Sequence, residues 1–134
     1  MSPQTYNLKW PALWLAIAWS LVAAVVYLSL VRLDVPLPAE GGDKYAHIAA
    51  YAVLMLWFAQ IYTDQRSRIV TAIGLAALGV ALEFLQGYTG YRTFDYADMV
   101  ANVTGVALGW MIAPPRTPNV VFRIERLRMN PPRP

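Results

Sequence analysis

Four long stretches of the chain are almost free of charged residues, and polar segments separate them. They run over residues 12–31, 45–62, 69–85 and 96–113, with Glu83 inside the third and Asp98 and Asn102 inside the fourth. A helix needs about 17–25 mostly apolar residues to cross roughly 30 Å of hydrocarbon, so each stretch is long enough, the last three only just. The pattern predicts four membrane-spanning helices.

The composition supports a membrane environment. The 134 residues are 57% hydrophobic and only 14% charged, whereas soluble domains carry about 25% charged residues. A soluble domain of this size and composition would expose more apolar surface than water tolerates. We therefore expect an all-α fold, specifically a four-helix transmembrane bundle.

The first apolar stretch is predicted to be a retained helix. It is longer than the roughly 7–15 apolar residues of a signal peptide, and no Ala-x-Ala cleavage motif follows it. Trp10 and Trp14 lie near its start and are candidate anchors, because tryptophan prefers the level of the lipid headgroups.

The positions of the basic residues predict the orientation. One side of the membrane receives Lys9, Arg66, Arg68, Arg116, Arg123, Arg126, Arg128 and Arg133, and the other receives Arg32, Lys44 and Arg92. Cytoplasmic loops carry the excess of Lys and Arg, so both termini are predicted to be cytoplasmic. We divide the chain into a four-helix transmembrane domain, residues 1–113, and a basic cytoplasmic tail, residues 114–134, expected to be solvated and to touch anionic lipid.

Several chemistries are excluded by residue type. The chain has no cysteine, so it cannot form a disulfide, a cysteine-ligated iron–sulfur cluster or a thiol nucleophile. It has a single histidine, so one chain cannot form a multi-histidine metal site. A site made of one histidine and carboxylates remains open. No basic face interleaved with aromatic residues is present, so nucleic acid is not an expected partner.

Ten polar residues fall near the outer ends of the predicted helices. They are Asp43, Lys44, His47, Tyr51, Glu83, Gln86, Arg92, Asp95, Asp98 and Asn102. Three sets among them each lie on one helix face, because their spacing is i, i+3 or i, i+3, i+7: Lys44, His47 and Tyr51; Glu83 and Gln86; Asp95, Asp98 and Asn102. Charged faces are costly in lipid, so we expect the three faces to meet inside the bundle and to form a shallow pocket.

The charges of this group do not balance. Four carboxylates stand against Lys44 and Arg92, which leaves two negative charges in excess when His47 is neutral. Either one carboxyl, with Glu83 as the candidate, carries a proton, or a cation fills the difference. The first alternative supplies a general acid or base, and the second a metal or amine site.

Small residues follow the polar ones on the third and fourth helices. Ala101, Gly105 and Gly109 form a small-xxx-small series on the fourth, and the third contains Gly74 and Gly79. Such surfaces let helix backbones approach closely. The glycines are expected to pack the bundle, although Gly105 and Gly109 could equally join two copies in a homodimer.

Three motifs occur in order along the chain: Asp43-Lys-Tyr-Ala-His47-Ile-Ala-Ala-Tyr51, Glu83-Phe-Leu-Gln86, and Arg92-Thr-Phe-Asp95-Tyr-Ala-Asp98-Met-Val-Ala-Asn102-Val-Thr-Gly105. Together they resemble the signature of the VanZ-like membrane proteins. The resemblance implies a small multi-pass protein of the bacterial cell (inner) membrane. It also implies a link to the cell envelope, because the family is named after a member associated with low-level teicoplanin resistance.

Three functions are weighed. The favoured one is an accessory protein that binds the head of a lipid or lipid-linked envelope precursor, with Asp43, Lys44, Tyr51, Gln86, Arg92, Asp95 and Asn102 as binding residues. The alternative is a membrane enzyme in which Glu83, His47 and Asp98 perform acid/base or metal-assisted chemistry, although no nucleophile elbow, HExxH or P-loop motif supports it. A proton-coupled transporter is disfavoured because the inner halves of the helices are apolar. The cofactor is left open.

Structural roles compete at several of these positions. His47 could be an interhelical hydrogen-bonding residue, and Glu83 could only pair with Lys44 or Arg92. Asp95 could cap the fourth helix. For Asp98 and Asn102, hydrogen bonds between helices are as well supported by the sequence as contact with a ligand.

Overall fold

The computed structural model describes residues 5–31, 42–90 and 94–129, and most of these residues are helical. The helices are α1 (Pro11–Leu30), α2 (Gly42–Ile61), α3 (Gln65–Tyr88), α4 (Tyr96–Met111) and α5 (Val120–Met129). The first four coincide with the four apolar stretches, so the all-α prediction is confirmed. The fifth lies in the segment that was expected to be a solvated tail.

Local sequence explains where the helices begin. Pro11 occupies the first turn of α1, where its missing N–H costs nothing. The Asp64 side chain accepts a hydrogen bond from the Ser67 backbone at 2.8 Å at the start of α3. Asp95 caps α4 in the same way through the Ala97 N–H, also at 2.8 Å. The capping role considered for Asp95 is therefore present.

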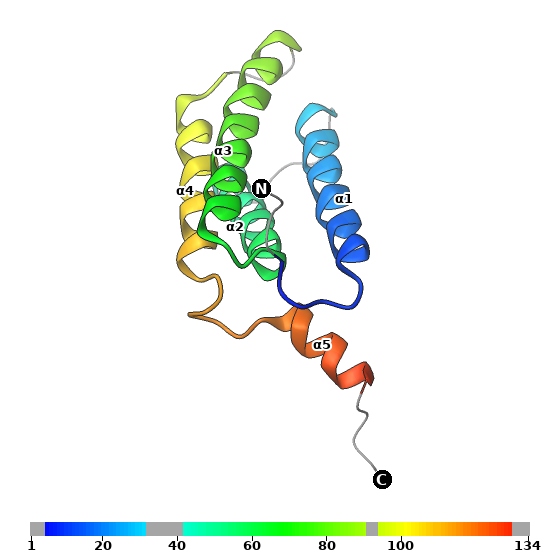
Figure 1. Cartoon of the computed structure of the whole chain (residues 1–134). Coiled ribbons are helices and arrows are strands. Elements are labelled where there is room, and N and C mark those ends of the chain that lie inside the picture. Colours follow the sequence, from blue (N-terminus) through cyan, green and yellow to red (C-terminus); the bar gives the residue numbers. More distant parts are fainter. Residues whose placement is uncertain (1–4, 32–41, 91–93, 130–134) are drawn as a thin grey trace.

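Helices α1 to α4 run alternately in opposite directions along the bundle (Figure 1). At one end, the Tyr6 N–H donates to the Ile61 carbonyl, and at the other the Gln86 side chain donates to the Ser29 carbonyl. We call the end where α2 and α4 begin the polar end, and the opposite end, which carries α5, the α5 end. The most extensive helix contact is between α2 and α4.

Within the described residues, the helices long and apolar enough to cross a membrane are α1 and α3. The four-span prediction is thus supported for only two of its four helices by length and composition. α4 has 16 residues and stops before Pro114-Pro115, because proline cannot continue the hydrogen-bond ladder. The first turn of α2 contains Asp43 and Lys44, which shorten its apolar part.

The outer faces of α1 and α3 are apolar and exposed. Large side chains with about half or more of their surface exposed include Leu13, Trp19 and Leu28 on α1 and Val70, Ile73 and Phe84 on α3. In a soluble protein, such helices would turn these side chains into the core. The exposure of this surface therefore fits a lipid environment.

Helix α5 docks against the start of α1 through a buried carboxylate. Glu125 accepts hydrogen bonds from the backbone N–H groups of Lys9 and Trp10, the latter at 3.0 Å, and from the Trp14 indole N–H at 2.7 Å. The free N–H groups at the start of a helix favour a negative charge. A residue 115 positions away in the sequence thus performs the capping that α1 lacks locally.

The hydrogen bonds determine the titration of Glu125. Burial raises the pKa of its carboxyl, but the bonds from Lys9, Trp14 and Trp10 together outweigh burial, so the pKa lies below the ordinary value of 4.5. A carboxylate with a lowered pKa in the folded state stabilises the fold above the unfolded pKa. Its contribution is lost as the pH falls through the folded value.

We therefore expect the melting temperature of the wild-type protein in detergent to fall between about pH 5 and pH 3 more steeply than that of Glu125→Gln. At pH 7, the variant should be less stable by about 1–2 kcal/mol, because its amide is a weaker acceptor than a carboxylate. The exposed neighbour Arg126→Gln is the control and should retain the wild-type profile. Parallel pH profiles for wild type and Glu125→Gln would contradict this account.

Candidate functional site

Five polar side chains from three helices meet near the polar end of the bundle. We call them the polar cluster: His47 and Tyr51 of α2, Glu83 of α3, and Asp98 and Asn102 of α4. All are buried except His47, which is partly buried. The helical spacing of the sequence brings them together as expected, since residues three to four apart share one helix face.

Hydrogen bonds fix the orientation of His47. Its Nδ1 lies 3.0 Å from Asn102 Oδ1, and Asn102 Nδ2 donates to the Gly79 carbonyl at 3.3 Å. Because a carbonyl only accepts, the amide nitrogen of Asn102 must face Gly79 and its oxygen must face the histidine. His47 Nδ1 therefore donates to Asn102, and His47 Nε2 lies 3.8 Å from Asp98 Oδ2.

Glu83 is the most deeply placed carboxylate of the cluster, with 1% of its surface exposed. One of its oxygens accepts a hydrogen bond from the Asp95 backbone N–H at 3.2 Å. Atoms of His47, Glu83 and Asp98 that could bind a metal ion all lie within 4.8 Å of one another. The three residues proposed from sequence as catalytic thus form one group.

Lys44 and two aspartates form a rim above the cluster, which we define as Asp43, Lys44 and Asp95. The Lys44 ammonium lies 2.9 Å from Asp95, 3.4 Å from Asp98 and 3.9 Å from Asp43. About a third or more of each rim side chain is exposed. The hydrogen bond from Lys44, followed by that from the Ala97 N–H, holds the pKa of the Asp95 carboxyl below its ordinary value.

Of the other predicted site residues, Gln86 lies apart from the polar cluster and the rim. The Gln86 side chain is buried, but it donates to the Ser29 carbonyl at 2.7 Å and so joins α3 to the end of α1. Arg92 lies outside the described residues. Tyr51 is in the cluster, and among residues 5–31, 42–90 and 94–129 its buried hydroxyl has no hydrogen-bond partner.

Gly79 is a site residue that sequence reasoning missed. A Cβ at this position would lie 2.8 Å from the Asn102 Cβ, so any side chain would displace Asn102. Its carbonyl also fixes the Asn102 amide. The sequence marked Gly79 only as one of several small packing residues, because nothing in its neighbours indicates that a buried amide lies opposite.

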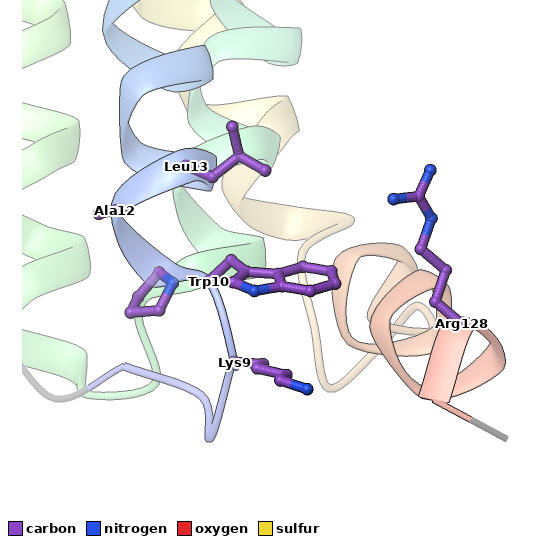
Figure 2. A pocket seen from close by; sticks show the side chains of 6 residues that line it. Lys9, Trp10, Ala12, Leu13 and Arg128 are labelled. Carbon is purple, nitrogen blue, oxygen red and sulfur yellow. The ribbon is translucent and has the colours of Figure 1, made fainter.

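A hollow of about 420 Å³ lies at the α5 end, far from the predicted site residues (Figure 2). It is lined by Lys9, Trp10, Pro11, Ala12, Leu13 and Arg128, and Figure 2 shows the Trp10 ring between the start of α1 and α5. Tryptophan and basic side chains together are typical of the headgroup level of a membrane. None of the residues predicted from sequence to bind a ligand lines this hollow.

The polar cluster supports two kinds of chemistry. A histidine and two carboxylates in contact range can exchange protons with a substrate, provided that the substrate reaches them. The same three side chains are a ligand set for a metal ion, with one nitrogen and two oxygen donors. The rim offers both signs of charge to a polar headgroup.

Comparison with known proteins identifies the family. A protein of the fission yeast Schizosaccharomyces pombe, itself described as uncharacterized, is 31% identical over 100 residues, which are 69% of this chain and 57% of that protein. The chain thus spans a little over half the length of this eukaryotic relative. No solved structure matches the chain. The family model described as VanZ/LLP1 matches residues 3–122, which include α1 to α4 entirely. As the three motifs predicted, the chain belongs to the VanZ/LLP1 family.

Proposed function

We propose that this protein is an integral membrane protein that binds the polar head of a lipid, or of a lipid-linked precursor of the cell envelope, at its polar end. The observation that carries the proposal is the meeting of ionisable side chains from α2, α3 and α4 in a bundle whose outer faces are otherwise apolar. Ionisable groups at membrane depth are costly, and they usually mark a ligand or ion pathway.

The distribution of positive charge supports an outward-facing site. Among the described residues, Lys44 alone of the basic residues lies at the polar end, whereas Lys9, Arg66, Arg68, Arg116, Arg123, Arg126 and Arg128 lie at the α5 end. By the positive-inside rule, the α5 end faces the cytoplasm and both termini lie there. This orientation requires a multi-pass protein in which α2 and α4 cross the membrane as well as α1 and α3.

The rim supports a headgroup as the ligand. The Lys44 ammonium is partly exposed and can bind a phosphate oxygen, while Asp43 and Asp95 can accept hydrogen bonds from hydroxyl or amine groups. For a bacterial member of the family in the inner membrane, binding of an envelope precursor would agree with the teicoplanin resistance from which the family takes its name.

The second candidate is a membrane enzyme that acts on such a head. The close grouping of His47, Glu83 and Asp98 favours it, because headgroup recognition alone does not require three mutually close titratable side chains below the rim. In this alternative, the rim binds the substrate and the cluster transfers protons or holds an ion.

Lipid binding is tested by native mass spectrometry of the protein in mild detergent with added polyprenyl phosphate or phosphatidylglycerol. We expect one lipid to bind the wild type and Lys44→Ala to bind it roughly tenfold more weakly, since a charge-assisted hydrogen bond contributes about 1.5–3 kcal/mol. Arg66→Ala removes an exposed charge at the α5 end and is the matched control. Equal lipid binding by Lys44→Ala and wild type would contradict the proposal.

The enzyme alternative is tested in cells. Glu83→Gln should abolish an envelope-stress or glycopeptide-sensitivity phenotype while lipid binding and membrane abundance stay normal. Loss of abundance together with the phenotype would instead indicate a structural role for Glu83.

A further inference from the structure

The arrangement around His47 leaves an unusual pair of atoms facing each other. Because Nδ1 is directed to Asn102, Nε2 is the ring nitrogen left to face Asp98 Oδ2, 3.8 Å away. This distance is too long for a hydrogen bond. A metal ion placed between the two atoms would bind both, through the Nε2 lone pair and the carboxylate oxygen.

Glu83 approaches the same space from the third helix. The candidate donor atoms of His47, Glu83 and Asp98 all lie within 4.8 Å of one another. Three ligand atoms that bind one metal ion at about 2.1 Å lie about 3–3.6 Å from one another. Metal binding therefore requires the ends of the side chains to approach one another by about 1 Å, which small rotations of their torsion angles allow. One ligand comes from each of α2, α3 and α4.

The charges of the group match a divalent ion. Glu83 and Asp98 are buried carboxylates, and an imidazole that binds a metal ion does so in its neutral form. The Lys44 ammonium is shared among Asp43, Asp95 and Asp98, so it cannot by itself neutralise the carboxylates around it. A doubly charged cation between the three side chains would offset the cost of burying two carboxylates.

We infer that His47 Nε2 and the carboxylates of Glu83 and Asp98 bind one divalent transition-metal ion of the Zn²⁺ or Mn²⁺ type. One imidazole with two carboxylates suits these ions, whereas Mg²⁺ prefers oxygen ligands only and keeps most of its waters. Three protein ligands leave at least one coordination position open, as in catalytic rather than structural metal sites.

Two further residues complete the site. Asn102 Oδ1 accepts a hydrogen bond from the His47 Nδ1–H and thereby fixes the tautomer, the usual role of an outer-shell partner of a metal-bound histidine. The Tyr51 hydroxyl is buried, has no hydrogen-bond partner in the described chain, and lies within electrostatic range of Glu83. It is a donor available to a water molecule on the ion. The metal site does not depend on lipid binding at the rim.

The test is metal binding by the detergent-purified full chain after removal of bound metal with a chelator. Isothermal titration with Zn²⁺ and Mn²⁺ should give one site per chain, and Mg²⁺ should bind much more weakly. We expect His47→Gln and Asp98→Asn to weaken Zn²⁺ binding at least 100-fold, and Asn102→Ala to weaken it about 10–100-fold. Asp64→Asn is the matched control and should bind as the wild type does, because this carboxylate caps α3 at the α5 end and asparagine caps a helix equally well.

A second measurement keeps the inference testable if the ligand variants fold poorly. X-ray absorption of the zinc-loaded wild-type chain should show one imidazole nitrogen with oxygen ligands at about 2.0–2.2 Å. Absence of a stoichiometric site, a spectrum without imidazole, or unchanged binding in folded His47→Gln and Asp98→Asn would each overturn the inference. Loss of lipid binding with retained zinc binding would contradict only the function proposed above.

Discussion

Gly105→Ala is expected to force α2 and α4 apart and to lower the free energy of unfolding by about 3 kcal/mol, the upper part of the range for overpacked interiors. A Cβ at Gly105 would lie 2.4 Å from the Ile48 carbonyl oxygen and 2.9 Å from the Tyr51 Cβ. Both atoms belong to or adjoin the α2 backbone, so no side-chain rotation relieves the overlap. The helices themselves must move.

The same contact recurs one turn further along the helix pair. A Cβ at Gly109 would lie 2.4 Å from the Ala52 carbonyl oxygen and 2.9 Å from the Met55 Cβ. These two glycines allow α2 and α4 to form the most extensive contact in the bundle. We expect Gly109→Ala to cost a similar amount. The double variant should cost less than the sum, because the first substitution already separates the helices.

Gly74→Ala is the control for both variants. It lies in α3 with nothing within 4 Å of an added Cβ, so alanine there should be neutral or stabilise by up to about 1 kcal/mol through helix propensity. Thermal unfolding in detergent measures all four proteins. Gly105→Ala should also weaken zinc binding, because it displaces the turn of α2 between His47 and Tyr51. A Gly105→Ala protein as stable as Gly74→Ala would contradict the close helix approach.

The sequence predicted the helices and the site better than their surroundings. Long apolar stretches are a direct consequence of a lipid-facing surface, so α1 to α4 were found with boundaries shifted by a few residues. The polar cluster was also predictable, because charged residues at i, i+3 and i+7 on an apolar helix must face inward. Its internal hydrogen bonds, such as Asn102 to Gly79, were not, since they depend on the rotation of each helix.

Helix α5 was missed because its sequence lacks a long apolar run. Four charged residues interrupt the segment from Val120 to Met129, so it resembles a solvated tail. Its docking depends on single residues whose partners are more than 50 positions away in the sequence. Glu125 of α5 accepts a hydrogen bond from Trp14 of α1. The Val120 N–H of α5 donates to the Gln60 side-chain oxygen of α2 at 2.8 Å.

Arg68 was interpreted as a loop charge that sets the membrane topology, and the structure instead buries it. Its guanidinium donates to the backbone carbonyls of Ala59, Tyr62 and Pro114 and contacts the Tyr6 hydroxyl at 3.4 Å. One side chain thus joins the end of α2, the start of α3, the segment after α4 and the N-terminal segment. Its charge is used inside the protein, so it contributes less to the positive-inside rule than a solvent-exposed arginine would.

Replacement of Arg68 is therefore expected to destabilise the α5 end strongly. Arg68→Ala would leave three backbone carbonyls without this donor, and each buried group that loses its partner costs about 1–3 kcal/mol. We expect a total loss of about 4 kcal/mol, measured by thermal or denaturant unfolding in detergent. Arg68→Lys should recover less than half of it, because an ammonium cannot reproduce the planar fork that reaches carbonyls in different directions.

Arg66→Ala separates this effect from the loss of a positive charge. Arg66 lies two residues earlier in the first turn of α3 and is exposed, so its removal should change stability by no more than about 0.5 kcal/mol. The metal affinity of the polar cluster should survive in Arg68→Lys, since the two sites lie at opposite ends of the bundle. If Arg68→Ala and Arg66→Ala were equally stable, other donors would have to bind the carbonyls around Arg68. The guanidinium would then not be the group that stabilises the α5 end.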